Sequence, residues 1–416
     1  MSLSLSKSKS INDLFFIITA IFLGYIAHIT GFEDLQFLAK TISDLFLKFL
    51  QLMSAPIVFL AIITNFLSIS AHNHLKSYGK KVLFYTVLTT ITAASLAYIL
   101  FQIIQPAVYI PKISGLSTLP NLSGIDVNLV QTFKENSNPS YYAELFKLFP
   151  SNIIKAFAEN NILGVALIAA MMGFAMMQIP KKQQDHLAIV FSGLFHTFIN
   201  LARYIITVLP IAIWAFTVLF LKVIEKNELI AENLRKYIFI VIAANLIQGF
   251  IILPLILKYK KLSPLKLIKS VYPALTTAFF SKSSSATLPL TMDCMIENHG
   301  TKEEIARFVL PICTIINMNG CAAFIYTTVL FIAIQSGIYF SSFDFIIWIF
   351  LATIIAIGNA SIPMGCYFLS SAILVGMGVS LDLMILILPI YTLFDMIETA
   401  LNVWSDCCVT ELVSIK

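Results

Sequence analysis

Long apolar stretches separated by short polar ones form the main pattern of this chain. Most of them approach the roughly 20 residues that an α-helix needs to cross a bilayer, so they predict membrane-spanning helices. Six lie in the first two thirds of the chain: Leu14–Ile29, Thr41–Ile69, Val82–Ile104, Ile162–Met177, Leu194–Val223 and Tyr237–Leu257. The second is long enough for a tilted helix. A polar stretch, Pro106–Pro150, separates the third from the fourth, and the pattern does not predict its structure.

The last third of the chain departs from this simple alternation, because its apolar stretches contain polar breaks. Non-helical backbone at membrane depth is tolerated only where protein encloses it or where it lines a cavity. Interrupted apolar segments, each followed by a helix with polar residues, are typical of inverted repeats around a site in mid-membrane. The breaks are residues 281–285 in Ser270–Met292, residues 317–320 in Thr301–Ile334, and residues 358–363 in Phe343–Met377. The two repeats would be Ser270–Ile334 and Phe343–Cys408.

The final apolar stretch, Leu388–Cys408, has polar side chains along one face. At about 100° per residue, four of them lie within roughly 40° of one line, and Glu398 lies about 60° to one side. The five polar positions are Asp395, Glu398, Thr399, Asn402 and Asp406. An acidic side chain in mid-bilayer costs a few kcal/mol or more, so three of them indicate function. An amphipathic helix outside the membrane is the alternative, but residues 383–393 are almost wholly apolar.

Composition supports a polytopic membrane protein. Of 416 residues, 58% are hydrophobic and 12% are charged, against about 25% charged in soluble domains. The net charge of +5 therefore does not indicate nucleic-acid binding. Lysines cluster at alternate ends of the apolar stretches, which predicts cytoplasmic N- and C-termini. We expect a multi-pass protein of a cell membrane, namely the cell inner membrane. These clusters are residues 7–9, 76–81, 181–182 and 258–269. No cleavable signal peptide is expected.

Six cysteines all fall in the last third of the chain. They form no C-x-x-C pair, and no histidine lies at ligand spacing from them, so we expect no metal centre built from cysteine. Single cysteines in apolar helices usually pack as small hydrophobic residues. The polar breaks are better candidates for chemistry: serine hydroxyls and free N–H groups bind anions, and unwound carbonyls coordinate small cations.

Four of these motifs together resemble the glutamate transporter family, the dicarboxylate/amino acid:cation symporters. The resemblance rests on order and spacing and covers most of the chain. The matching motifs are Ser283–Pro289 (SSSATLP), Asn317–Gly320 (NMNG), Gly358–Pro363 (GNASIP) and the Asp395–Asp406 pattern, with weaker matches at Met53–Phe59 and Asn160–Gly173. It implies an all-α fold of eight transmembrane helices plus two re-entrant helical hairpins. It also implies a homotrimer, in which each protomer has a scaffold domain and a transport domain that moves like an elevator.

The resemblance further implies domain boundaries. Residues 1–150 would hold the first three membrane helices and the polar loop, the third helix belonging with the transport domain. Residues 151–269 would hold the fourth to sixth helices. Residues 270–416 would form the core transport domain, with both hairpins and the seventh and eighth helices.

The same resemblance implies binding residues for an amino acid and for sodium. Asp395 would hold the substrate amino group, and Asn402, helped by the serine tip, its α-carboxylate. The substrate set is Ser283, Ser284, Ser285, Cys321, Ile362, Cys366, Asp395, Glu398, Thr399 and Asn402. Two sodium sites would involve Cys313, Asn317, Met318, Asn402, Asp406, Ala356, Ile357 and Asn359. A third cation site, altered in this chain, would involve Thr89, Thr90 and Asn319. No cofactor is expected besides the coupling ion.

Departures from the family pattern bear on specificity. Glu398 stands where acidic-substrate members have an arginine, and Cys321 where they have a threonine. Asn319 replaces the aspartate of the third sodium site, and the hairpin tip, glycine-rich in the family, carries Ser361, Met364 and Cys366. We therefore expect a cationic or polar neutral amino acid as substrate rather than glutamate or aspartate, with coupling to Na⁺, to H⁺ or to both. An acidic amino-acid symporter with altered coupling and a transport-inactive receptor are the alternatives.

Electrostatics support the same expectation. Asp395 and Glu398 are helix neighbours, about 5–6 Å apart at Cβ, and at an effective dielectric near 20 they repel by roughly 3 kcal/mol. A cationic substrate side chain would relieve this repulsion, and so would a proton on Glu398. An intramembrane enzyme would need a nucleophile beside a base. The sequence offers none, because five of the six histidines lie toward loops or outside the polar cluster, namely His72, His74, His186, His196 and His299. We expect no enzyme.

Overall fold

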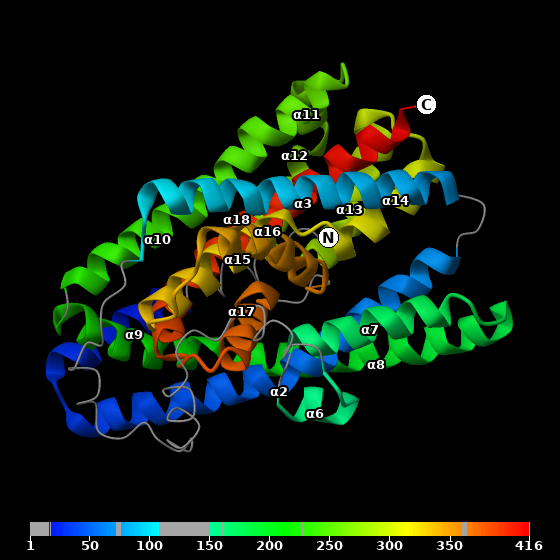
Figure 1. The fold of residues 1–416 in the computed structure, drawn as a ribbon. Helices are drawn as coiled ribbons and strands as arrows, with labels where there is room; N and C mark the ends of the chain where they lie inside the picture. Colours follow the sequence, from blue (N-terminus) through cyan, green and yellow to red (C-terminus); the bar gives the residue numbers. More distant parts are fainter. Residues whose placement is uncertain are drawn as a thin grey trace.

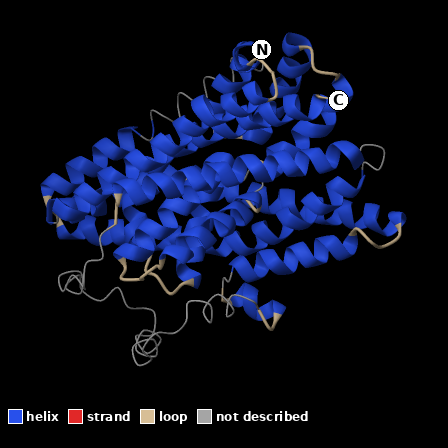
Figure 2. Ribbon diagram, turned by 45° about the horizontal axis from the view of Figure 1, so that its top comes forward, coloured by secondary structure: helices blue, strands red, loops and turns tan. Residues whose placement is uncertain are grey.

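The computed structural model describes residues 16, 18–71, 76–107, 150–159, 162–226, 228–359 and 364–415. Helices account for nearly all of the described chain, and no strand occurs in these ranges (Figures 1 and 2). The all-α prediction is therefore confirmed for the described residues. Most of the Pro106–Pro150 stretch, namely residues 108–149, lies outside them.

The first apolar stretches form helices close to the predicted bounds. An N-terminal helix covers Ile18–Thr30. The next helices are α2 (Glu33–Ala71), α3 (Lys76–Ile104), α6 (Ile153–Ala158) and α7 (Ile162–Met176). The 39-residue helix α2 continues through Pro56. It packs along α7, α8 (Lys181–Thr207) and α9 (Leu209–Lys226), which run beside it in the lower half of Figure 1.

The prediction of one span over Leu194–Val223 was wrong. The structure has two helices there, α8 and α9, which meet at a turn at Val208. Pro210 lies in the first turn of α9, where its missing N–H leaves no helical hydrogen bond unmade. The apolar character continues through the turn, and therefore the hydrophobic pattern does not reveal it. The sixth stretch forms a continuous helical rod: α10 (Glu228–Ile247), a π-helical segment η3 (Gln248–Ile252) and α11 (Leu253–Tyr259).

All three predicted breaks interrupt helices. The first separates α12 (Pro264–Ser281) from α13 (Ser284–Asp293), where Lys282 adopts a left-handed φ of 53° and Ser283 caps α13. Further breaks separate α14 (Glu303–Ile316) from α15 (Asn319–Gln335), and α16 (Ser342–Ile357) from α17 (Gly365–Gly376). A short π-helical segment, η4 (Cys294–His299), follows α13. The polar-faced stretch lies within the unbroken helix α18 (Asp382–Ser414).

The core of the described chain surrounds α15, whose residues from Asn319 to Ala333 are all buried. Helices α3, α16, α17, α18 and α10 pack around it. Helix α18, red in Figure 1, also contacts α12, α14 and α9. The break between α14 and α15 therefore lies inside the protein, opposite the polar face of α18.

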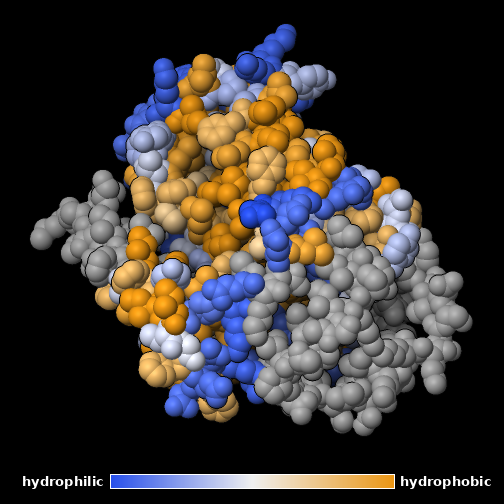
Figure 3. All heavy atoms as spheres, turned by 90° about the vertical axis from the view of Figure 1, so that its left-hand side faces the viewer, coloured by the Kyte–Doolittle hydropathy of each residue, from blue (hydrophilic) through white to orange (hydrophobic). Residues whose placement is uncertain are grey.

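On the face drawn in Figure 3, apolar side chains gather over the upper half. Examples on α10 to α12 are Phe239, Phe250, Leu255 and Leu265. Large apolar side chains exposed in such number are typical of a surface that faces lipid. In the described residues, five helices are long and apolar enough to cross a membrane. Eight spans and two re-entrant hairpins stay a prediction.

Candidate functional site

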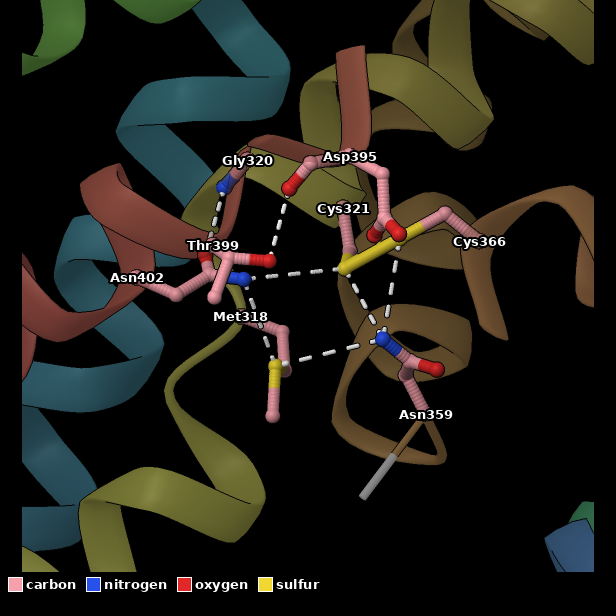
Figure 4. The surroundings of a disulfide bond; sticks show 8 residues. All are labelled: Met318, Gly320, Cys321, Asn359, Cys366, Asp395, Thr399 and Asn402. Atoms are coloured by element: carbon pink, nitrogen blue, oxygen red, sulfur yellow. Dashed lines mark hydrogen bonds between the residues drawn. A yellow bond between two sulfur atoms is a disulfide. The ribbon is translucent and has the colours of Figure 1, made fainter. Parts of the chain in front are cut away.

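Polar residues from five separate elements meet around one small cavity in the core, part of which is drawn in Figure 4. Its volume of about 20 Å³ is enough for roughly one water molecule. The cavity lies where the α12–α13 turn, the α14–α15 break, the end of α16 and the start of α17 reach the middle of α18. Its lining residues are Lys282, Ser284, Met318, Cys321, Asn359, Gly365, Cys366, Asp395, Glu398, Thr399 and Asn402.

Helix α18 contributes two carboxylates to this cavity, Asp395 and Glu398. Glu398 is 1% exposed, and neither of its carboxylate oxygens has a hydrogen-bond partner among the described residues. An unsatisfied buried charged group costs more than the 1–3 kcal/mol typical of a neutral one. Glu398 lines the cavity although it lies about 60° away from the other polar positions of α18. Thr399 donates its hydroxyl to the Asp395 carbonyl over 2.6 Å, a bond within the helix.

Asn402 connects α18 to the first turn of α15. Its amide oxygen accepts a hydrogen bond from the backbone N–H of Gly320 at 2.9 Å. Its amide nitrogen lies 3.5 Å from the sulfur of Met318 and 3.8 Å from the sulfur of Cys321 (Figure 4). Sulfur is a weak acceptor. The amide N–H groups of Asn402 therefore remain available to a stronger acceptor, such as a carboxylate placed in the cavity.

The three serines of the α12–α13 turn have different positions. Ser283 accepts a hydrogen bond from the N–H of Ala286 and so caps α13. Ser284 is 5% exposed and lines the cavity, whereas Ser285 faces outward. The sequence analysis gave no role to Lys282, although the lysine lies inside the predicted break. It is the only lysine or arginine among the cavity-lining residues of the described chain.

Cys321 and Cys366 form a disulfide that joins the start of α15 to the start of α17 (Figure 4). Their Cα atoms are 5.4 Å apart, within the usual range for such bonds. The expectation that the cysteines are separate packing residues was therefore wrong for this pair, because the fold brings together residues 45 positions apart. Asn359 donates its amide to the Cys321 sulfur at 2.9 Å and the Cys366 sulfur at 3.6 Å. The other four cysteines are free and buried.

A second polar cluster lies deeper, around Asp406 and the α14–α15 break. Asp406 accepts hydrogen bonds from the amide of Asn317 at 3.0 Å and from the hydroxyl of Thr314 at 3.4 Å. Asn317 also donates to Ser405 at 2.9 Å. The side chains of Asn317, Ser405 and Asp406 are all at most 1% exposed. This buried, hydrogen-bonded carboxylate is the position that the resemblance assigns to a sodium site.

Asn319 extends this cluster toward α3 and η3. Its amide nitrogen donates to Asn317 at 2.9 Å and to Ser405 at 2.7 Å, and lies 3.4 Å from the hydroxyl of Thr89. Its amide oxygen accepts a hydrogen bond from Gln248 at 3.0 Å. Gln248, which the sequence analysis missed, also donates to the Thr89 carbonyl at 3.0 Å. Amide hydrogens therefore occupy the positions next to the oxygen atoms that a cation would need.

The remaining predicted ion-site residues are partly placed. Ala356, Ile357 and Asn359 end helix α16 beside the break, and Asn359 reaches the disulfide. The Cys313 carbonyl accepts a hydrogen bond from the Asn317 N–H at 2.8 Å. Thr90 donates its hydroxyl to the Thr86 carbonyl within α3, rather than to the Asn319 cluster. Ile362 and Ser361 lie outside the described residues.

The sequence model of the sodium:dicarboxylate symporter family matches residues 14–415. The chain belongs to this family. The human protein named neutral amino acid transporter A is 28% identical over 401 residues, covering 87% of this chain and 73% of the relative. Human neutral amino acid transporter B(0) is 27% identical, with coverage of 87% and 71%. A putative sodium-dependent excitatory amino acid transporter of Caenorhabditis elegans, glt-6, is 27% identical, with coverage of 89% and 72%.

Membership in the symporter family confirms the resemblance drawn from the motifs. The family and these relatives are transporters, so the chain is not an enzyme, as expected. Membership also supports a multi-pass membrane protein that moves a small solute and uses Na⁺ as the coupling ion.

Proposed function

We propose that this member of the symporter family is a secondary active amino-acid transporter whose substrate is cationic or polar and neutral. The observation that carries the proposal is the arrangement of one cavity. Asp395 and Glu398 provide negative charge for amino groups, while Ser284, Lys282 and the amide of Asn402 provide donors for a carboxylate. An α-amino acid needs negative charge beside its amino group and hydrogen-bond donors beside its carboxylate, on opposite sides of its α-carbon.

Charge in the cavity argues against an acidic substrate. The lining residues carry two carboxylates and one ammonium group. A glutamate or aspartate would add two carboxylates and one ammonium group of its own to a water-poor site, where unpaired charges are costly. A lysine, arginine or histidine would bring a second positive group to Glu398, whose oxygens have no hydrogen-bond partner among the described residues. If Glu398 instead holds a proton, a neutral polar substrate is favoured, and transport is linked to protons.

The names of the relatives point to more than one class of amino acid. Two of the relatives above are named neutral amino acid transporters, and the third is named an excitatory amino acid transporter. The names therefore support an amino acid as the solute. The proposal of a cationic or polar neutral amino acid rests on the cavity of this chain.

We further propose that sodium coupling is reduced relative to members with a carboxylate at position 319. Asp406 remains as an anionic ligand, and the carbonyl groups near Asn317 and Asn359 are retained. Hard cations favour charged oxygen ligands, whereas Asn319 presents amide hydrogens to Asn317, Ser405 and Thr89. Two sodium ions, with or without a proton, are the expected coupling.

The assembly follows from family resemblance and is part of the proposal. A homotrimer in a cell membrane would hold each protomer by its scaffold helices, while residues 270–416 and the third helix move as an elevator. Both termini would face the cytoplasm.

Uptake by purified protein in proteoliposomes tests the substrate proposal. Lysine, arginine, histidine, serine, glutamine, aspartate and glutamate would compete at fixed pH with a transported radiolabelled amino acid, in wild type, Glu398→Gln and Glu398→Arg. We expect cationic or polar neutral amino acids to inhibit most strongly, and cationic preference to fall in Glu398→Gln. Strong inhibition by aspartate or glutamate in wild type would refute the proposal. Unchanged cationic preference in Glu398→Gln would show that discrimination does not reside in this carboxylate.

A further inference from the structure

Cys321, Cys366 and Glu398 form a compact group of metal-ligating side chains at the cavity. One potential ligand atom from each lies within 4.8 Å of the others, and all three residues are buried. They come from the first turn of α15, the first turn of α17 and the middle of α18. No other such group of histidine, cysteine, aspartate and glutamate occurs within the described ranges.

The dimensions of this group fit one tetrahedral ion. Zinc binds thiolate sulfur at about 2.3 Å and carboxylate oxygen at about 2.0–2.2 Å, so the ligand atoms of one tetrahedral ion are about 3.6–3.8 Å apart. When the disulfide opens, the sulfur atoms separate to van der Waals contact, close to the spacing of two thiolates on a tetrahedral ion. Small side-chain movements therefore suffice to place all three ligands.

Glu398 supplies an independent indication of a ligand. Its carboxylate is 1% exposed and lines the cavity, and both of its oxygens have no hydrogen-bond partner in the described part of the chain. The cavity of about 20 Å³ has room for roughly one water-sized species. An ion fits this space without movement of the helices, whereas an amino acid requires the cavity to widen.

We propose that the reduced protein binds a soft divalent cation of the Zn²⁺ class through Cys321, Cys366 and Glu398. A dithiol reductant first breaks the S–S bond, transferring two electrons and two protons to the sulfur atoms and becoming a disulfide itself. Metal binding then displaces the two thiol protons. Thiolate ligands select soft ions over Na⁺, Mg²⁺ or Ca²⁺, so this site is separate from the sodium sites.

The bound ion would connect α15, α17 and α18 across the cavity. Since Cys321, Cys366 and Glu398 all line this cavity, metal and amino acid would exclude each other. Cys321 and Cys366 would be joined by the disulfide under oxidising conditions and by the metal ion under reducing conditions. Metal binding itself does not rest on the proposed transport function.

Cadmium titration of the full-length protein in detergent tests this site, because Cd²⁺ replaces Zn²⁺ at thiolate sites and gives an ultraviolet sulfur-to-metal charge-transfer band. The protein would be reduced with a water-soluble phosphine, which takes an oxygen atom from water and leaves two thiols. Comparison proteins are Glu398→Gln, the double variant Cys321→Ser/Cys366→Ser and reoxidised wild type. The reoxidised protein carries no substitution, so it controls for misfolding of the double variant.

We expect the reduced wild type to show a saturable band with one Cd²⁺ per chain. Reoxidation and the double substitution should abolish it, and Glu398→Gln should weaken binding by at least about tenfold, no less than the loss of a supporting side chain costs. A band that persists after reoxidation would place the metal on other cysteines, such as Cys407 and Cys408, and would overturn the proposal. So would the absence of a band when a thiol assay shows Cys321 and Cys366 reduced.

Discussion

The side-chain amide of Gln248 donates a hydrogen bond to the amide oxygen of Asn319 over 3.0 Å, and both side chains are fully buried. Gln248 lies in the π-helical segment η3, and Asn319 begins helix α15. With its oxygen held by Gln248, Asn319 points its amide hydrogens at Asn317 and Ser405. The pair thus fills, with neutral hydrogen bonds, the place of the proposed third cation site.

Asn319→Asp should create sodium-dependent stability. The new carboxylate has no amide hydrogens to donate to Asn317 and Ser405, so its charge would be buried with too few hydrogen bonds. In choline chloride the variant should therefore unfold at a lower temperature than wild type. In sodium chloride, an ion bound only by the folded state should restore the melting temperature by mass action. Thermal unfolding in detergent, measured in the two salts at equal ionic strength, checks this.

Asn233→Asp is the matched control for that experiment. Asn233 is 1% exposed and lies in α10, so it undergoes the same chemical change in a buried place outside the Asn319 cluster. Its melting temperature should fall equally in both salts. If sodium changes the melting temperature of Asn319→Asp no more than that of wild type, then position 319 is not part of a cation site.

Asp395→Asn should remove most amino-acid binding. The proposed role of Asp395 is to pair with the substrate amino group in a partly enclosed site, where losing one partner of a charge pair costs about 2–5 kcal/mol. The amino acid that most stabilises wild type should therefore bind the variant at least tenfold more weakly, as read from the concentration dependence of the melting temperature. Glu304→Gln, an exposed acid at the start of α14, should bind like wild type. Equal affinities in Asp395→Asn and wild type would exclude this role.

Local sequence pattern was enough to predict the polar face of α18 and the three broken helices. Asp395, Asn402 and Asp406 follow the helical period, and the breaks contain serine, asparagine, glycine or proline between apolar arms, so both signals are local. The turn at Val208 was missed because the residues around it are as apolar as the helices it joins. Hydrophobicity reports burial or lipid contact, and it changes little across a tight turn between two such helices.

Contacts between distant elements were beyond the sequence. Cys321 and Cys366 pair across 45 residues, and Gln248 reaches Asn319 across 71. Neither spacing has a periodicity that a pattern could detect, because each depends on how α15 packs against α17 and η3. Lys282 could have been predicted as a site residue from the sequence, since it lies in the serine-rich break. A cation at the tip of a break in a membrane segment is itself a signal of function.

Crosslinking should reveal a trimer. The family resemblance implies three protomers, and the wide apolar surfaces of the described helices leave room for both lipid and subunit contacts. An amine-reactive or glutaraldehyde crosslinker applied in mild detergent should give a ladder that ends at the three-subunit band and does not change on dilution. A clean monomer, or a ladder that continues beyond three, would contradict the assembly.

Gly320→Ala should destabilise the protein, because no side chain fits between α15 and α18. A Cβ at Gly320 would lie 2.8 Å from the Cα of Glu398 and 2.9 Å from the amide oxygen of Asn245. Backbone cannot yield as a flexible side chain does, so α15 must move away from α18 and stretch the Gly320 N–H bond to Asn402. Overpacking of this kind costs about 1–3 kcal/mol, and both the melting temperature and uptake should fall.

Gly193→Ala supplies the control for the same substitution in an open place. A Cβ there meets nothing within 4 Å, and Gly193 lies inside helix α8, where alanine is favoured over glycine by about 1 kcal/mol. This variant should melt at or slightly above the temperature of wild type and keep its uptake. If Gly320→Ala behaves in the same way, then the tight approach of α15 to Glu398 does not exist in the folded protein.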